Sequence, residues 1–157
     1  LVGIQDREYM LKNAINALKK SYDYILIDCP PTLNLLTVNA LVAATAVLIP
    51  MQCEYYALEG LSDLVNTIKR VKKQLNPKIE IEGLLRTLFD KRNTLAQQVS
   101  DELSSHFGSK VYKTIIPRNV RLAEAPSHGK AALFYDKSSK GAKAYLALAE
   151  EMLRGNA

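Results

Sequence analysis

The chain has 157 residues, enough for one compact domain with a sizeable core. Hydrophobic residues make up 48% and charged residues 24%, the balance of an ordinary globular protein. No uninterrupted apolar run approaches the ~18 residues of a membrane-spanning helix, and two cysteines cannot form a disulfide framework. The counts therefore exclude a membrane-spanning helix and a disulfide scaffold, and they favour a reducing cytoplasm.

The formal net charge of +5 is concentrated in one part of the chain. Between Lys110 and Lys143, eight basic residues are opposed only by Glu124 and Asp136, so this stretch alone carries +6. A local basic region suits an anionic partner such as nucleic acid. A solvated lysine-rich surface explains the same charge equally well, so charge alone leaves both interpretations open.

The periodicity of apolar residues predicts helices and strands that alternate along the chain. Asp6 is expected to cap a helix that runs to about Lys20. Residues 22–28 form an almost continuous apolar run ending in Asp28, which predicts a strand that the following Pro30 stops. Thr32 is then expected to cap a second helix, through residues 33–43.

Six more elements are predicted, at spacings that suit short strands and amphipathic helices. They are a strand at 46–49 closed by Pro50, a helix at 57–75, a strand at 79–88, a helix at 95–107 ended by Gly108, a strand at 111–116 and, last, a helix at 139–153. Short buried strands alternating with helices specify crossover connections, hence a mainly parallel sheet with helices on both faces. We therefore expect a single α/β domain over residues 1–157.

Ligands of such sheets bind beyond the carboxyl ends of the strands. In this chain the rule selects Asp28, residues 52–55, residues 89–93 and residues 117–121. Residues 52–54 are expected to face a dimer partner or a nucleotide, with an ordinary loop as the alternative.

Asp28 has the most suggestive position of these candidates. A carboxylate that ends an apolar strand is the pattern of a Walker B motif, where it holds magnesium beside phosphates. A strand-end aspartate is also a common turn or cap residue. The usual partner, the phosphate loop Gly-x-x-x-x-Gly-Lys-Ser/Thr, does not occur in these 157 residues.

Other chemistries find less support. Cys29, His106 and His128 lack the strand–turn–helix context of a nucleophile with an oriented base. Two cysteines and two histidines without close spacing also argue against a structural zinc site.

Three long blocks strongly resemble the ParA/Soj chromosome-partitioning ATPases, in order and with family-like spacing. They are YDYILIDCPPTLNLLTVNAL at 22–41, IPMQCEYYALEGL at 49–61 and IPRNVRLAEAPSHGK at 116–130. The resemblance implies a P-loop NTPase-like fold that here lacks the amino-terminal P-loop strand and helix. It therefore implies that residues 1–157 are the carboxyl-terminal part of such an ATPase domain.

The resemblance also implies roles for single residues. Asp28 matches the Walker B aspartate, which would act in catalysis and hold Mg²⁺, directly or through water. Pro117, Arg118 and Asn119 match the segment that packs around adenine in the family. Thr87 lies where relatives such as MinD place an adenine-contacting asparagine.

Arg92 and Arg121 match positions that resemble the family's non-specific DNA-binding arginines. The basic stretch surrounds Arg121, and Lys130 lies in the same stretch, so we expect a DNA-binding face that bears all three residues. Without the resemblance, a surface pair between Arg121 and Glu124 would be preferred.

The resemblance implies a cytoplasmic, nucleoid-associated ATPase with ATP and Mg²⁺ as cofactors. Its expected partners are non-specific DNA, a ParB-type protein that stimulates hydrolysis and a second copy bound in the presence of ATP. The chain alone is expected to be inactive. The alternatives are a non-catalytic DNA- or partner-binding module and a MinD-like cell-division ATPase. Because residues 150–157 are short and acidic, we expect no membrane attachment.

Overall fold

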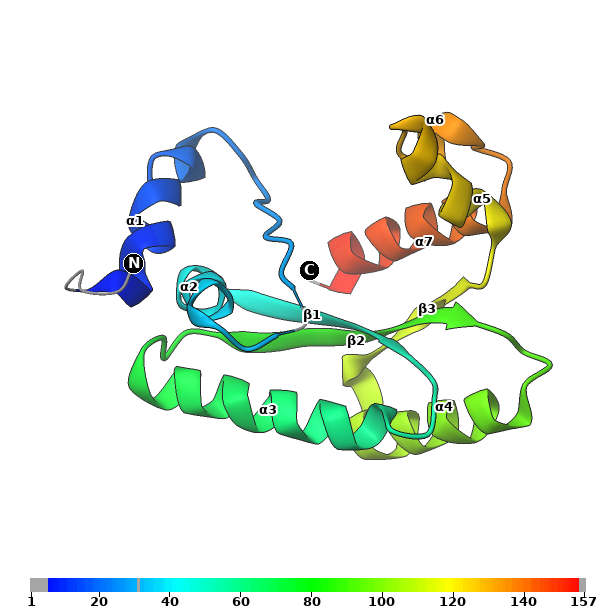
Figure 1. Ribbon diagram of the computed structural model, residues 1–157, viewed down its shortest axis with the longest axis horizontal. Helices are drawn as coiled ribbons and strands as arrows, with labels where there is room; N and C mark the ends of the chain where they lie inside the picture. Colours follow the sequence, from blue (N-terminus) through cyan, green and yellow to red (C-terminus); the bar gives the residue numbers. More distant parts are fainter. Residues whose placement is uncertain (1–5, 31, 156–157) are drawn as a thin grey trace. The chain divides into compact units, whose positions relative to one another are not determined.

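Strands and helices alternate along the computed structural model, which describes residues 6–30 and 32–155 (Figure 1). The α-helices and strands are α1 (Met10–Ile15), α2 (Leu35–Ala43), β1 (Ala46–Gln52), α3 (Ala57–Gln74), β2 (Glu80–Phe89), α4 (Thr94–Phe107), β3 (Val111–Pro117), α5 (Val120–Glu124), α6 (Ala132–Tyr135) and α7 (Lys140–Gly155). Short 3-10 helices lie at Arg7–Tyr9, Leu18–Lys20, Gly108–Lys110 and Ala125–His128. The expected α/β class is confirmed.

The strands form one parallel sheet in the order β1-β2-β3. The pairs across β2 and β3 are Leu84–Val111, Arg86–Ile115 and Phe89–Pro117. Between the first two pairs β3 advances four residues while β2 advances two, so β3 carries two extra residues there. Between the last two pairs β2 carries one extra residue. The sheet therefore has a bulge in each of these strands before they end.

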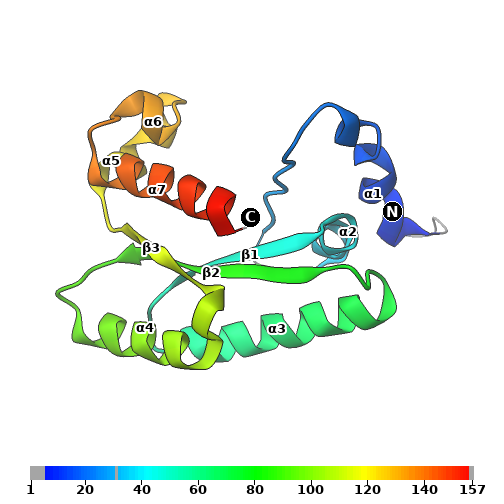
Figure 2. The same cartoon turned by 180° about the vertical axis from the view of Figure 1, so that it is seen from behind.

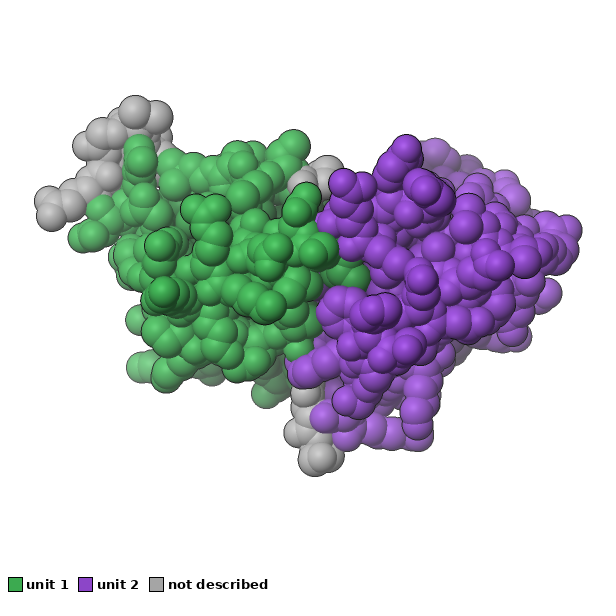
Figure 3. Space-filling model, turned by 90° about the horizontal axis from the view of Figure 1, so that it is seen from below, with its two compact units in different colours: residues 1–47, 61–81 green, residues 48–60, 82–157 purple. Residues whose placement is uncertain are grey.

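The chain divides into two compact units, which Figure 3 shows in different colours. Unit 1 comprises residues 1–47 and 61–81, and unit 2 comprises residues 48–60 and 82–157. Strands β1 and β2 and helix α3 each contribute to both units.

Two buried asparagines hold unit 1 together. The Asn39 side chain donates to the carbonyls of Arg7 and Leu35 at 2.9 and 3.0 Å and accepts from the Leu11 amide at 3.1 Å. Asn76 donates to the carbonyls that end α2, those of Leu41 and Ala44. Each of these amide side chains hydrogen-bonds to several backbone groups. The two side chains thereby join α1 and the residues after α3 to α2, and their own buried polar atoms are paired.

The predicted strand at 22–28 is wrong. Residues 22–30 form no strand or helix, and Leu26 is 87% exposed, with Tyr22 and Tyr24 also exposed. An apolar run becomes a strand only when a neighbouring strand pairs with its amides and carbonyls. No strand among the described residues pairs with this run.

Three smaller expectations also fail. Asp6 does not cap a long helix: its φ is 57°, and the stretch to Lys20 is divided into the short α1 and two 3-10 helices. Asn34, not Thr32, caps α2, because its side-chain oxygen accepts from the Leu36 and Thr37 amides. Pro50 does not close β1, which continues to Gln52. Proline is tolerated at an edge strand such as β1, where one row of amides needs no ladder partner.

Unit 2 has its core where α7 packs on β3. Leu85, Tyr112, Ile116 and Leu148 are buried together, and Leu122 of α5 packs against them. Helix α4 covers the opposite face of β2 and β3, as both ribbon views show (Figures 1 and 2). The sequence predicted α4 and α7 but not the short helices α5 and α6 between them.

The described residues include no helix long and apolar enough to cross a membrane.

Gly141 lets α7 approach α5 closely. A Cβ at this position would lie far inside van der Waals contact with Cγ of Leu122. We therefore expect Gly141→Ala to lower the free energy of unfolding by about 1–3 kcal/mol, although alanine is the better helix former by about 1 kcal/mol.

The matched control is Gly60→Ala in α3, where a Cβ would meet nothing within 4 Å. Urea unfolding is expected to show no loss of stability for Gly60→Ala, or a small gain. Equal midpoints for the two variants would contradict the close approach of α5 and α7.

Candidate functional site

A small cavity of about 130 Å³ lies at the carboxyl ends of the strands in unit 2. Its walls come from the end of β1, the end of β2, the start of α4 and the residue after β3. They are Gln52, Cys53, Glu54, Leu88, Phe89, Asp90, Asn93, Ala96 and Arg118. The sequence selected 52–55, 89–93 and 117–121 from the strand-end rule, and the structure brings members of all three sets together. We take this cavity as the candidate site.

Strand ends and caps fix the walls of the cavity. The Arg118 amide donates to the Phe89 carbonyl at 3.1 Å, which joins the chain after β3 to the end of β2. Asn93 caps α4 by accepting from the Leu95 and Ala96 amides. Leu88 lies in the β2 bulge with a φ of 50°, a left-handed conformation that costs a non-glycine residue about 1–2 kcal/mol. The end of β2 is thus held in a strained turn beside the cavity.

Asp90 and Arg92 form a two-pronged ion pair at the rim. Arg92 donates from Nε and Nη2 to the two carboxylate oxygens of Asp90 at 3.0 and 2.8 Å, and its backbone amide donates to the same side chain. These bonds lower the pKa of Asp90 from 3.8 to about 2. Arg92 stays 89% exposed, so its outer face is accessible to an anion.

The Asp90–Arg92 pair gives a pH prediction. Because the pKa of Asp90 is lower in the folded chain than its ordinary 3.8, the pair is complete above about pH 4 and is lost as pH falls toward 2. Carboxylate titration by NMR should give a midpoint near 2. Arg92→Ala should return it toward 3.8, and the neighbouring exposed variant Lys91→Ala should leave it unchanged. A midpoint near 3.8 in the unmodified chain would contradict the pairing.

Of the residues predicted to surround adenine, some lie at the cavity and others do not. Arg118 lines the cavity, and Pro117 ends β3 just before it. The Asn119 side chain accepts from the Arg121 amide at 3.0 Å and caps α5. The Thr87 hydroxyl donates to the Met51 carbonyl of β1 at 3.2 Å, and Thr87 is not among the residues that line the cavity. Thr87 therefore joins two strands, and its contact with adenine stays a prediction.

Arg121 is enclosed by carboxylates. It pairs with Glu124 at 2.9 Å and with Asp136 at 3.5 Å, and the Tyr135 hydroxyl donates to the same Glu124 carboxylate. The guanidinium of Arg121 is the main cause that lowers the pKa of Glu124. The surface pair considered from the sequence is confirmed, and Arg121 also ties α5 to the residue after α6. Lys130 is exposed in the loop before α6.

Asp28 lies in unit 1, exposed in the irregular segment 22–30, and is not among the residues that line the cavity. The described residues hold no group of three or more His, Cys, Asp or Glu side chains that could bind a metal ion. The role of Asp28 as Mg²⁺ ligand and catalytic residue stays a prediction. The cavity itself offers one cation, Arg118, beside the carboxylates of Glu54 and Asp90, so the residues present do not fit a magnesium triphosphate.

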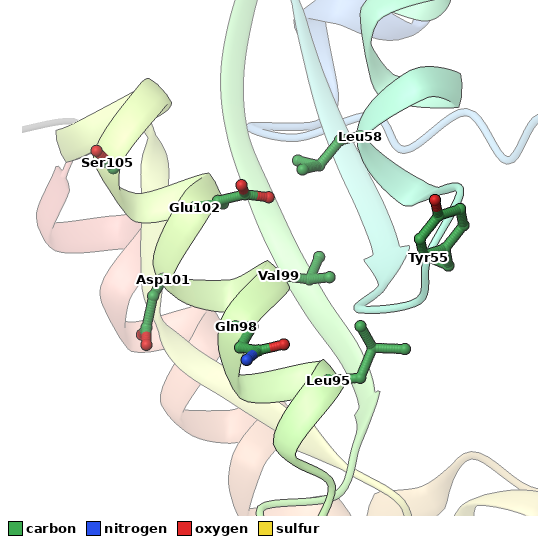
Figure 4. A pocket seen from close by; sticks show the side chains of 8 residues that line it. All are labelled: Tyr55, Leu58, Leu95, Gln98, Val99, Asp101, Glu102 and Ser105. Atoms are coloured by element: carbon green, nitrogen blue, oxygen red, sulfur yellow. The ribbon is translucent and has the colours of Figure 1, made fainter.

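A second, larger groove of about 610 Å³ also belongs to unit 2 (Figure 4). Leu58 from α3 and Leu95 and Val99 from α4 point into it, across from the Tyr55 ring. Glu102 lies on the same side of α4. Tyr55 and Tyr56 are both more than 70% exposed.

Sequence reasoning missed Leu88 and Ala96, which line the cavity but lie outside the ranges selected by the strand-end rule. The left-handed backbone of Leu88 had no signal, because leucine is a poor candidate for that conformation.

The fold matches those of solved P-loop ATPase structures over part of their length. The chain resembles a solved Mycobacterium smegmatis cobyrinic acid a,c-diamide synthase with bound ATP analogue and magnesium, with a TM-score of 0.80 and 36% identity over 96% of this chain and 55% of that one. A family described as AAA domain matches residues 1–81. The chain belongs to this family, in its ParA/Soj chromosome-partitioning ATPase branch.

Two curated relatives match almost all of the chain. The sporulation initiation inhibitor protein Soj of Bacillus subtilis is 58% identical over 152 residues, which are 97% of this chain and 60% of Soj. The chromosome partitioning protein ParA of Caulobacter vibrioides is 53% identical over 149 residues, 94% of this chain and 56% of ParA. The chain therefore spans less than two thirds of the length of these relatives.

Proposed function

We propose that this chain is part of a chromosome- or plasmid-partitioning switch that dimerises on ATP and binds DNA without sequence preference. A ParB-type partner would stimulate its hydrolysis, in the nucleoid-containing cytoplasm. The observation that carries the proposal is the identity of 53–58% to ParA and Soj over almost the whole chain. Residues 1–157 would then belong to one ATPase domain.

The nucleotide would approach the cavity at the strand ends. Arg118 and the neighbouring Pro117 and Asn119 are proposed to border the base, with Thr87 behind them on β2. Asp28 is proposed to hold Mg²⁺ and to orient water in the whole protein. Because the residues present do not fit a triphosphate, no step of hydrolysis is derived from them.

A DNA-binding face is proposed at Arg92, Arg121 and Lys130. All three are exposed, and Arg121 and Lys130 lie in the stretch 110–143, which carries a net charge of +6. Phosphate contacts depend on salt, and the loss of one contact lowers the slope of log affinity against log salt by about one. Glu124 and Asp136 compete with phosphate for Arg121, so this arginine must leave part of its ion pairing to bind DNA.

The test measures binding of the intact protein to two unrelated DNA duplexes at several salt concentrations. Arg121→Ala and Lys130→Ala should weaken binding to both duplexes alike and lower the salt slope by about one each. Arg154→Ala, an exposed arginine on α7, is the control and should change neither.

Glu124→Gln distinguishes a direct contact of Arg121 with phosphate from a purely structural role, because it frees Arg121 from its nearest carboxylate. If Arg121 binds phosphate, this variant should bind DNA as tightly as the unmodified protein or more tightly. If Glu124→Gln and Arg121→Ala each weaken DNA binding, Arg121 acts only by holding α5 and α6 together. Unchanged binding by Arg121→Ala at every salt concentration would overturn the assignment.

A non-catalytic binding module is the second candidate. The charges of the cavity favour it, because the one cation that lines the cavity, Arg118, lies beside the carboxylates of Glu54 and Asp90. DNA binding that needs no nucleotide, in a protein that releases no phosphate from ATP, would decide for this alternative.

A further inference from the structure

Two successive peptide units of β3 are held between opposite charges from two other elements. The bulge adds two residues to β3 between Val111 and Ile115. Its peptide units, Tyr112–Lys113 and Lys113–Thr114, cannot join a regular ladder with β2. Their amides and carbonyls therefore need other partners.

The carbonyls are bonded from the β2 side. Arg86 donates from Nη2 to the Tyr112 carbonyl at 2.6 Å and to the Lys113 carbonyl at 3.4 Å. Its Nη1 donates to the hydroxyl of Ser100, a fully buried residue of α4, at 2.9 Å. Within the described residues Arg86 makes no ion pair and its buried Nε has no partner. Its charge is therefore directed at the bulge and not at a carboxylate.

The amides are bonded from α7. The Glu151 carboxylate accepts from the Lys113 amide at 2.6 Å and from the Thr114 amide at 2.8 Å. Burial raises the pKa of Glu151, but the bonds from Thr114 and Lys113 outweigh it and leave the pKa below its ordinary value. Because the C=O and N–H of a trans peptide point in opposite directions, the guanidinium and the carboxylate hold both peptide units from opposite sides.

The held segment leads directly to the candidate site. Pro117 follows the bulge by three residues, and the next amide, that of Arg118, donates to the Phe89 carbonyl beside the cavity. Bulges next to active sites change the direction of the residues that follow them. We propose that Arg86 and Glu151 are positioning residues that set the register of β3, so that residues 117–119 reach the cavity. The proposal rests on the proposed function, in which these residues border adenine.

The test compares Glu151→Gln with the control Glu150→Gln in the 157-residue chain. Glutamine has the shape of glutamate but offers one acceptor oxygen, so one of the two amides loses its partner. Glu150 precedes it on α7, and among the described residues its side chain bonds to the exposed Arg154 side chain. Amide hydrogen exchange by NMR should accelerate about tenfold at whichever of Lys113 and Thr114 loses its partner in Glu151→Gln, and it should also accelerate at Arg118. The control should change none of these rates.

Adenosine, which has no phosphates, probes the base side alone. At millimolar concentration it should shift the Arg118 and Asn119 amide signals of the unmodified chain, and these shifts should need several times more adenosine in Glu151→Gln. Arg86→Lys keeps the charge but loses the planar fork. Arg86→Lys should accelerate exchange at the same amides. It replaces Glu151→Gln in the test if that variant unfolds.

Three results separate the ideas. Faster exchange confined to residues 113 and 114, with Arg118 and adenosine binding unchanged, would overturn the positioning role. Faster exchange at Arg118 in both variants supports it. If adenosine shifts no signal in the unmodified chain while Arg118 still responds to Glu151→Gln, positioning of the segment stands and the adenine assignment falls.

Discussion

Mg-ATP is expected to bind the 157-residue chain only weakly and to be hydrolysed no faster than in a control without protein. A phosphate loop supplies converging backbone amides, a lysine and a helix N-terminus, and its sequence motif does not occur here. The cavity at the strand ends offers one guanidinium beside two carboxylates. Removal of a single electrostatic stabiliser commonly costs ~10²–10³ in rate, and here the main set is missing.

Calorimetry and phosphate release with Mg-ATP measure both parts of this expectation. Asp28→Asn is the matched control, because it removes the proposed Mg²⁺ ligand from an exposed segment that forms no strand or helix. Micromolar affinity, or turnover that Asp28→Asn abolishes, would contradict the prediction and reveal a phosphate site. Turnover that this variant leaves intact would come from a contaminating ATPase.

Self-association of the chain through its apolar segment 22–30 is the second large effect that we expect. Leu26 is 87% exposed there, with Tyr22 and Tyr24 also exposed. The segment makes no strand, and β1 is an edge strand of the sheet. Apolar extended segments and open strand edges pair with other chains.

Light scattering should therefore give a mass above that of one chain, and Leu26→Lys should shift the mass toward that of a monomer. The control is Leu153→Lys on α7, which charges a leucine that is 60% exposed outside the segment. A monomer at all concentrations in the unmodified chain would contradict the expectation. An equal effect of both variants would mean that general surface hydrophobicity, not the segment, drives association.

Elements with a strong periodic pattern could be predicted from the sequence. Helix α3 was expected at 57–75 and is observed at Ala57–Gln74, and β3 differs by one residue. In α3, for example, Leu61, Ile68 and Val71 are buried at the spacing of the apolar pattern. The run at 22–28 has an equally strong pattern, but a strand also requires a partner, and the pattern of one segment contains no information about its neighbour.

The candidate site could be predicted in outline only. The strand-end rule selected residues 52–55, 89–93 and 117–121, and members of all three sets line the cavity, because the rule depends on sheet topology alone. The strand-end rule does not predict the contacts of single side chains. Arg121 reaches Asp136, and Arg86 reaches a bulge that Glu151 completes from 65 residues away in sequence. Such pairs depend on three-dimensional packing, which local sequence does not encode.

The carboxylate of Glu151 also limits how large an assembly of this chain can become. β3 is the last strand in the sheet order, so among the described residues its outer side has no strand neighbour. The bulge and the two amides bonded to Glu151 leave no regular row of donors for another molecule's strand. Strand pairing between copies is then restricted to the β1 side. Molecules with one adhesive edge stop at a closed pair, whereas molecules with two can add subunits without end and form fibres.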